Sequence, residues 1–240
     1  MNHHPKRRKV KIERLILVIF VFIMIIIGSV SALNVILKPK NVPIAKVSIQ
    51  GAPLVFLSYK IAPLPDFDRD GVDDFREIIY GARIDAQNMV TYRSVYYAGG
   101  YPPDNEGVCT DMIWRALLNA GYNLKDLIDE DIVLNRSKYP QIDFRDPNID
   151  FRRVWNIKIF LDLHAMKLTN DIYDRDEWMP GDFVIFGDEY SHIGFVSDIK
   201  NSNEIPYLIH NNGQANREED RLEFGFKDQG ITGHYRWILH

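Results

Sequence analysis

The amino-acid sequence predicts an α+β domain in which helices come first and a meander of antiparallel strands follows. Two observations lead to this prediction. Apolar residues recur at helical spacing from Phe75 to Met89 and again from Val108 to Ala120. After Asp182, short runs rich in β-branched and aromatic residues alternate with turn residues. Segregated helices and strands of this kind are typical of helices packed on an antiparallel sheet.

The other elements follow along the chain. The helix that starts near Val108 is expected to end at Gly121, because glycine commonly ends helices. Residues 96–107 are rich in Gly, Pro and Tyr and predict a loop, whereas residues 139–153 are polar and irregular. Residues 154–163 predict another helix. Strands are expected at residues 183–186, 192–197, 207–210 and 231–239.

The composition is that of a globular protein. Apolar residues make up 46% of the 240 residues and charged residues 26%. The formal net charge is −4 although several basic residues gather at the N-terminus, so the rest of the chain is more acidic than this total. Nucleic-acid binding requires a basic patch, and we therefore expect no nucleic-acid partner. A single cysteine excludes an internal disulfide.

The N-terminal segment predicts a membrane anchor. Residues 1–14 form a basic tail, and residues 15–37 are apolar and uncharged over a length that crosses a hydrocarbon core about 30 Å thick. Basic residues stay cytoplasmic, so one transmembrane helix would hold the rest of the chain outside the cell membrane. The alternative is a cleavable signal peptide ending near Ala32, which exports the same domain. Proline-rich residues 38–65 are interpreted as a stalk, with a short strand at residues 53–59.

Residues 66–77 match the spacing of a calcium-binding loop, D-x-D-x-D-G-x-x-D-x-x-E. Oxygen ligands at this density suit Ca²⁺, which takes about six to eight of them. The alternative is an acidic, solvated turn at a helix N-terminus, and Asp73 stands where such loops usually carry an aliphatic residue. We expect a structural Ca²⁺ that fixes the stalk to the domain of residues 78–240. The expected ligands are Asp66, Asp68, Asp70, the Val72 carbonyl, Asp74 through a water molecule, and Glu77.

Three residues are candidates for thiol chemistry. Cys109 lies where the glycine-rich loop turns into a helix, and a helix N-terminus favours the reactive thiolate. His192 opens one predicted strand and His210 ends the next. Neighbouring antiparallel strands bring such positions to the same edge of a sheet. A buried core cysteine and structural histidines are the alternative for each residue taken singly.

These residues occur in an order that resembles the NlpC-type cysteine peptidases of the papain superfamily. The matching segments are Tyr96-Tyr-Ala-Gly-Gly, Gly107-Val-Cys-Thr-Asp, Met179-Pro-Gly-Asp-Phe-Val, His192-Ile-Gly-Phe and Ile209-His. The resemblance implies a papain-like fold with Cys109 as nucleophile, His192 as general base and acid, and His210 as the group that orients His192. Tyr96 would lie near the oxyanion, with Tyr97 as the other candidate. Val108 and Thr110-Asp111 depart from the family's Asp-Cys-Ser-Gly, which leaves the substrate open.

Residues 75–240 also resemble the bacterial family known as domain of unknown function 1287. The matching segments are Gly107-Val-Cys-Thr-Asp, Asp146-Pro-Asn-Ile-Asp-Phe-Arg-Arg, His192-Ile-Gly, His210-Asn and Gly233-His-Tyr-Arg. Within these segments, Arg152 or Arg153 is a candidate for a substrate carboxylate, and an internal salt-bridge network is the alternative. Asp111 and Asn211 are further substrate-binding candidates. Asp111 alternatively bonds nearby backbone, and Asn211 alternatively replaces His210 as orienting residue.

These assignments predict an exported, thiol-dependent amidase or peptidase that needs no cofactor for catalysis. Peptidoglycan stem peptides are the expected substrate, or another extracellular amide. One alternative keeps the same site but transfers the acyl group to an amine, as an acyltransferase or transpeptidase does. Another is a non-catalytic module that binds cell wall. A zinc site formed by Cys109, His192 and His210 is the third alternative.

Overall fold

A computed structural model describes residues 64–189 and 191–238, and these residues belong to one compact unit. The predicted basic tail, transmembrane segment and stalk up to residue 63 lie outside the described residues. Among the helices that are described, none is long and apolar enough to cross a membrane.

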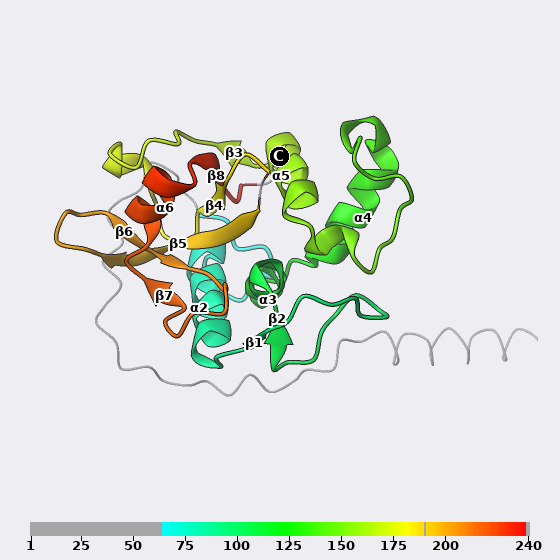
Figure 1. The fold of residues 1–240 in the computed structure, drawn as a ribbon, viewed down its shortest axis with the longest axis horizontal. Helices are drawn as coiled ribbons and strands as arrows, with labels where there is room; N and C mark the ends of the chain where they lie inside the picture. Colours follow the sequence, from blue (N-terminus) through cyan, green and yellow to red (C-terminus); the bar gives the residue numbers. More distant parts are fainter. Residues whose placement is uncertain (1–63, 190, 239–240) are drawn as a thin grey trace, which may run out of the picture. The chain divides into compact units, whose positions relative to one another are not determined.

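In the described part of the chain, four α-helices precede the strands of the large sheet (Figure 1). Helix α2 spans Asp74–Gln87, α3 spans Cys109–Asn119, and α5 spans Val154–His164, as the apolar spacing predicted. Helix α4, Leu124–Leu134, was missed, although Asn123 caps it by accepting a hydrogen bond from the Asp126 N–H group. Because α2 begins at Asp74, the boundary expected at residue 78 falls inside a helix.

The strands form a six-stranded sheet in the order β3-β8-β4-β5-β6-β7, and every neighbouring pair is antiparallel. This confirms the prediction of an α+β domain with an antiparallel sheet. Two short strands elsewhere pair in parallel, β1 (Thr91–Tyr92) and β2 (Glu106–Gly107). The strands of the large sheet are β3 (Met166–Lys167), β4 (Phe183–Phe186), β5 (His192–Lys200), β6 (Pro206–Ile209), β7 (Glu218–Glu219) and β8 (Ile231–Arg236).

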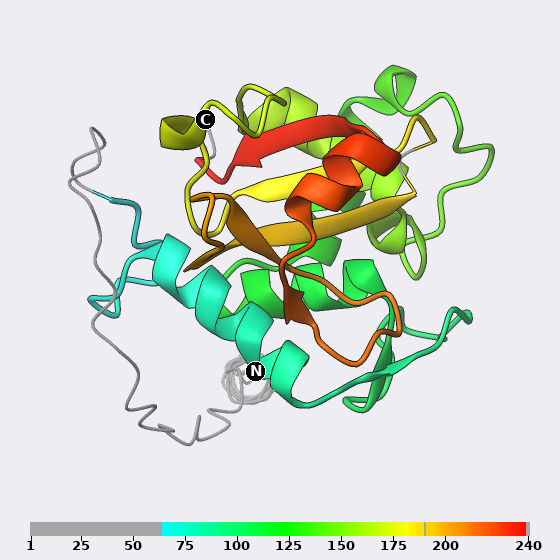
Figure 2. The same ribbon diagram turned by 60° about the vertical axis from the view of Figure 1, so that its left-hand side comes forward.

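Both faces of this sheet are covered, which explains why β4 is apolar throughout. Phe183 and Ile185 belong to the large core that the sheet shares with helices α2 to α5. Val184 and Phe186 point to the opposite face, into a smaller core that includes Leu222 of helix α6 (Leu222–Asp228). Figure 2 shows α6 crossing the sheet on the side away from α3. Alternate residues of a strand face opposite sides, so a strand covered twice has no polar face.

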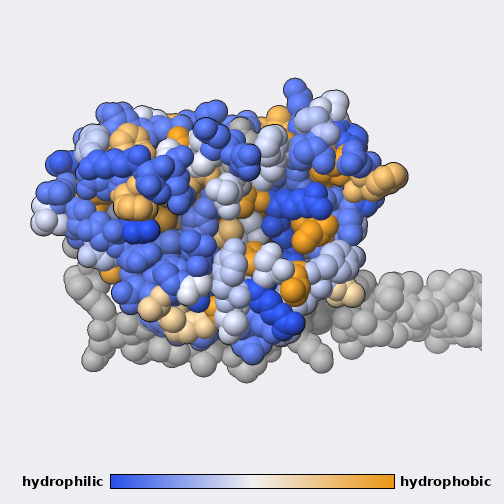
Figure 3. Space-filling model, in the orientation of Figure 1, coloured by the Kyte–Doolittle hydropathy of each residue, from blue (hydrophilic) through white to orange (hydrophobic). Residues whose placement is uncertain are grey.

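The outer surface contrasts with these two cores. In the orientation of Figure 1, hydrophilic residues dominate the described part of the surface, and apolar residues are scattered among them (Figure 3). Scattered exposed apolar side chains are normal for a soluble domain.

Asp182 fixes the start of β4 to the C-terminal strand. Its buried carboxylate accepts hydrogen bonds from Arg236 Nε at 2.9 Å and from Arg236 Nη2 at 2.8 Å. His234 Nε2 lies 3.0 Å from the same carboxylate, and the His234 ring stacks on Trp178 at 3.7 Å. His234 is therefore a structural residue.

We expect Asp182→Ala to lower the free energy of unfolding by about 3–5 kcal/mol, because it leaves Arg236 buried without its counter-charge. Urea unfolding followed by circular dichroism measures this change. The matched control is Asp176→Ala, which removes an exposed carboxylate and should stay within about 0.5 kcal/mol of wild type. Equal effects of the two substitutions would contradict the structural role of Asp182.

Candidate functional site

Cys109 is the first residue of helix α3, as predicted, but its thiol is buried. Only 5% of the residue is exposed, and it packs in the large core with Ile193 and Phe195 of β5. Burial raises the pKa of the thiol to about 11, although the backbone N–H groups of Ile193 and Thr110 act in the opposite direction. The helix start therefore does not produce a thiolate here, because desolvation of the charge outweighs it.

The N-terminus of α3 is held by the carboxylate of Asp111. Asp111 Oδ2 accepts a hydrogen bond from the Val108 N–H group at 2.8 Å, which caps the helix. Arg152 donates two hydrogen bonds to the same carboxylate, from Nε at 2.7 Å and from Nη2 at 2.8 Å. Both side chains are buried. The geometry therefore favours the internal ion pair, and the capping of nearby backbone, over contacts with a substrate.

Arg152 also connects α3 to the loop before it. Its Nη1 group donates to the Val95 carbonyl at 2.9 Å, and its guanidinium lies 5.0 Å from the centre of the Tyr97 ring. The Thr110 hydroxyl donates to the Arg152 carbonyl at 2.9 Å. Thr110 and Asp111, where the sequence departs from the NlpC-type pattern, thus anchor the residues on either side of Cys109.

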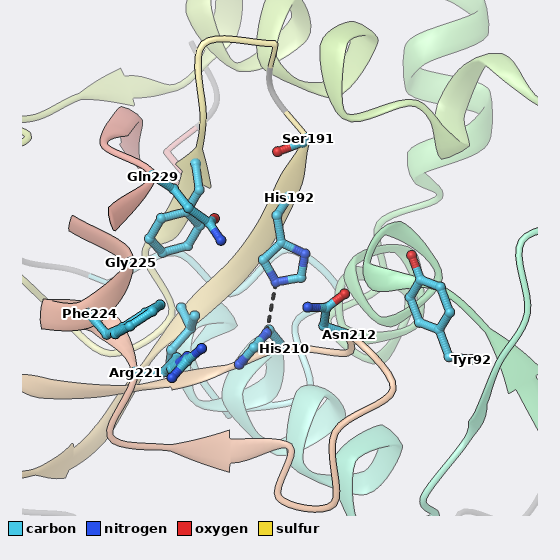
Figure 4. Close-up of a pocket in the computed structure, with 11 residues that line it drawn as sticks. Tyr92, Ser191, His192, His210, Asn212, Arg221, Phe224, Gly225 and Gln229 are labelled. Carbon is cyan, nitrogen blue, oxygen red and sulfur yellow. Dashed lines mark hydrogen bonds between the residues drawn. The ribbon is translucent and has the colours of Figure 1, made fainter. Parts of the chain in front are cut away.

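His192 and His210 meet at one edge of the sheet, as their strand positions predicted. Their rings are joined by a hydrogen bond of 2.8 Å between His192 Nε2 and His210 Nδ1 (Figure 4). Between them lies Gly194, where an added Cβ would come within 2.8 Å of the Ile209 carbonyl oxygen and 3.0 Å of His210 Cβ. The close approach of β5 and β6 here therefore requires glycine.

His210 also contacts a carboxylate that was not predicted from the sequence. His210 Nε2 lies 3.1 Å from Glu219 Oε1 on β7. If His210 donates to Glu219, its Nδ1 accepts the proton of His192 Nε2, and His192 Nδ1 keeps a lone pair. The Gln214 amide nitrogen also lies 3.0 Å from His210 Nε2, and its Oε1 accepts from the Asn212 N–H group at 2.7 Å. When Gln214 donates to His210 Nε2, the other tautomer holds: His210 Nδ1 donates to His192 Nε2, and His192 Nδ1 carries a proton.

Both imidazoles are neutral at physiological pH. Burial lowers the pKa of His192 to about 3 and that of His210 to about 4. The charge of His210 acts further on His192, and the charges of Arg221 and Arg217 act on His210. A neutral pair suits the tautomers just described, in which one proton lies between the two rings.

The two histidines line a cavity of about 220 Å³. Arg221 and Phe224 lie on one side of the imidazoles in Figure 4, and Tyr92 lies on the other. The remaining lining residues are Phe186, Ser191, Leu208, Asn212, Gly225 and Gln229. Phe186 and Leu208 belong to the smaller core, so the cavity opens on the α6 side of the sheet.

Cys109 does not line this cavity. Its thiol belongs to the core on the α3 side, and its nearest link to the histidines is the Ile193 N–H group, directly after His192. Within residues 64–189 and 191–238, neither imidazole makes a hydrogen bond with the thiol. The zinc alternative finds no support, because the described His, Cys and acidic side chains that converge closely enough for a metal are those of another cluster, Asp66, Asp68 and Asp70.

Of three nearby tyrosines, the structure places Tyr92 in the cavity. The pKa of its phenol is raised by burial first, and Cys109, when ionised, and Asp111 act in the same direction, so Tyr92 lies near the thiol. Tyr96, the candidate from the sequence, is exposed and accepts a hydrogen bond from Asn148 at 3.0 Å. Tyr97 donates to Glu106 at 2.7 Å. The path of the loop before Cys109, which the sequence does not determine, places Tyr92 in the cavity rather than Tyr96 or Tyr97.

The two other substrate-binding candidates are placed differently. Asn211 is buried next to His210, and its side-chain oxygen accepts from the Gly213 N–H group at 3.2 Å. Its amide nitrogen is buried without a hydrogen-bond partner in the described part of the chain. His210, rather than Asn211, therefore contacts His192. Arg153 is exposed at the start of α5.

Comparison with known proteins is consistent with the second resemblance found in the sequence. Residues 79–237 match the family described as domain of unknown function 1287. The chain belongs to this family. It is 34% identical over 168 residues to the uncharacterized protein YijF of Escherichia coli K12. The aligned region covers 66% of this chain and 80% of YijF. No solved structure matches the chain.

Cys109 should react slowly with iodoacetamide at neutral pH, and its reaction rate should rise with pH up to about 11. A free cysteine has a pKa of about 8.5, so we expect the native thiol to react at least about 100-fold more slowly at pH 7. Mass spectrometry measures the rate without ambiguity, because the chain has one cysteine. The urea-unfolded chain is the control, and equal rates in both states at pH 7 would contradict the buried, neutral thiol.

Proposed function

We propose that this domain is an exported thiol-dependent amide hydrolase, with a papain-like fold and peptidoglycan stem peptides as its substrate. One observation carries the proposal. When His210 donates to Glu219 rather than accepting from Gln214, His192 Nδ1 keeps a lone pair, and this atom has no hydrogen-bond partner in the described residues. General-base catalysis needs a neutral imidazole that a second polar group orients, and His192 meets these two conditions. Its low pKa makes it a weak base, and the thiol lies outside the cavity.

The reaction begins with a neutral thiol. Because the pKa of Cys109 is about 11 and that of His192 about 3, no thiolate–imidazolium pair exists beforehand. His192 Nδ1 takes the thiol proton as the sulfur attacks the substrate carbonyl. The same proton then passes to the leaving amine, and the C–N bond breaks to leave an acyl thioester on Cys109. Water, deprotonated by His192, releases the acid and returns the proton to the sulfur.

This mechanism requires the thiol and the imidazole to come into contact when substrate binds. Contacts of this kind are often long in free enzymes and tighten in the substrate complex. His192 is the first residue of β5 and is half-buried, so its side chain is less constrained than one in the middle of the sheet. The Ile193 N–H group already lies against the sulfur, which makes the required movement local.

Arg221 supports a substrate that carries a free carboxylate. Its guanidinium stacks on the exposed Phe224 ring at 3.7 Å and makes no ion pair within the described residues. A cation on the cavity wall whose donors have no acceptor among the described residues suits recognition of a carboxylate. Peptidoglycan stem peptides carry such carboxylates beside the amide bonds that join their residues.

A second candidate is a binding module that uses the same cavity without catalysis. The buried, neutral thiol, which lies on the α3 side of the sheet, favours it. In that case Cys109 is a core residue, and the imidazoles and Arg221 serve only to hold a peptide. Assays of digestion and of binding separate the two candidates.

We expect Cys109→Ala to abolish cleavage, lowering the rate at least about 10³-fold, because loss of a nucleophile removes most of the rate enhancement. The measurement is mass spectrometry of muropeptides after digestion of purified cell wall. Circular dichroism of the variant controls for folding. Digestion by Cys109→Ala as fast as by wild type would rule out thiol catalysis, and retained peptide binding without any digestion by wild type would establish the binding module. A product joined to an added amine would indicate acyl transfer.

We expect Arg221→Ala to raise KM, or Kd for a binding module, about 10- to 100-fold, the value of a hydrogen bond to a charged group. Steady-state kinetics with a stem peptide and with the same peptide amidated at its carboxylate provide the measurement. Wild type should prefer the free acid, and the variant should not distinguish the two. Arg175→Ala, which alters an exposed arginine away from the cavity, is the matched control. An unchanged preference in Arg221→Ala would exclude this role.

A further inference from the structure

Three carboxylates converge before helix α2. Oxygen atoms of Asp66, Asp68 and Asp70 all lie within 4.8 Å of one another. Two oxygens bound to one Ca²⁺ at about 2.3–2.6 Å are at most about 5 Å apart, so this spacing suits a shared ion. Asp68 and Asp70 are exposed, and convergence of exposed acidic groups is by itself common.

A second observation comes from Glu77, on the first turn of α2. Only 8% of Glu77 is exposed, and its Oε2 atom is buried without a hydrogen-bond partner in the described residues. Glu77 lies on the helical turn that directly follows the loop, and the charges of Asp68 and Asp70 act on its carboxylate. It is not among the carboxylates whose oxygens lie within 4.8 Å of one another. A buried carboxylate without a partner is costly, and a cation removes that cost.

None of the described Lys, Arg or His side chains forms an ion pair with Asp66, Asp68, Asp70 or Glu77. Arg76 is paired with Asp73 at 3.1 Å, and Asp73 also caps α2 by accepting from the Arg76 N–H group. Asp73 thus lies in the same acidic loop, but its side chain caps helix α2.

Two residues of the loop region, Asp74 and Phe67, contact Tyr122 of the domain. Asp74 is fully buried and accepts hydrogen bonds from the Tyr122 hydroxyl at 2.5 Å and from the Phe67 N–H group at 2.9 Å. Phe67 stacks on the Tyr122 ring at 4.2 Å. Tyr122 follows α3, so the loop is tied to the turn between α3 and α4. With both oxygens engaged, Asp74 has a structural role whether or not a bound water also reaches it.

We propose that Asp66, Asp68, Asp70 and Glu77, with the Val72 carbonyl, form a Ca²⁺ site that fastens the segment entering the domain to helix α2. The site supplies hard oxygen ligands alone, which suits Ca²⁺ rather than a softer metal. It lies apart from the histidine cavity, with which it shares no lining residue. Its role is to stabilise the domain, so it is independent of the proposed hydrolysis.

The test is calcium titration of the full-length chain in detergent, by isothermal titration calorimetry, together with the thermal transition in CaCl₂ and in EDTA. We expect one Ca²⁺ per chain with a Kd below about 10⁻³ M, and a transition that moves up when Ca²⁺ is added. MgCl₂ at the same concentration should shift it less, because Mg²⁺ demands a smaller, octahedral site.

Paired variants distinguish a site from general charge. Glu77→Gln should weaken Ca²⁺ binding at least about 10-fold while the chain stays folded in EDTA. Asp73→Asn removes one charge from the same loop and keeps a good helix cap, so its Kd should stay within about 3-fold of wild type. The proposal fails if wild type shows no saturable binding, or if Asp73→Asn weakens binding as much as Glu77→Gln.

Discussion

The bidentate ion pair between Asp111 and Arg152 is the interaction on which the candidate site depends. It is buried, and it fixes the first turn of α3 to the loop before the helix and to the 3₁₀ turn Asp150–Arg152. A charge pair removed from water tolerates little displacement, because a lost partner leaves an uncompensated charge. Cys109 and the backbone beside it are therefore held at one place against β5.

The sheet imposes a second constraint. Because helices cover both faces, residues that alternate along β4 and β5 are divided between two cores. Cys109 belongs to one side, and the cavity with its two imidazoles opens on the other. The end of β5 is where the two sides meet, since His192 lines the cavity while the N–H group of Ile193 reaches the thiol. The proposed thiol catalysis would therefore require movement at this strand end, whereas binding of a peptide in the cavity would not.

The side chains of two arginines near the site, Arg83 and Arg217, position residues that contact the histidines. Arg83 on α2 donates from Nε to the carboxylate of Glu218 at 3.1 and 3.0 Å, which positions β7. Glu219, the next residue, then meets His210. Arg217 donates to the Val90 carbonyl at 2.9 Å and to Gln214 at 3.1 Å. These contacts position Glu219 and Gln214 beside His210 Nε2, and the choice between the two partners sets the histidine tautomer.

The sequence by itself determined the class of fold, three of the helices, the main strands, the helix-start position of Cys109, and the meeting of His192 with His210. These follow from periodicity and from strand order, which are local properties. Only the tertiary structure decided that Arg152 pairs with Asp111, that Tyr92 rather than Tyr96 enters the cavity, that Glu219 completes the histidine chain, and that burial keeps Cys109 neutral. Each of these depends on groups far apart in sequence and on the water they lose when the chain packs, and neither spacing nor composition records that loss.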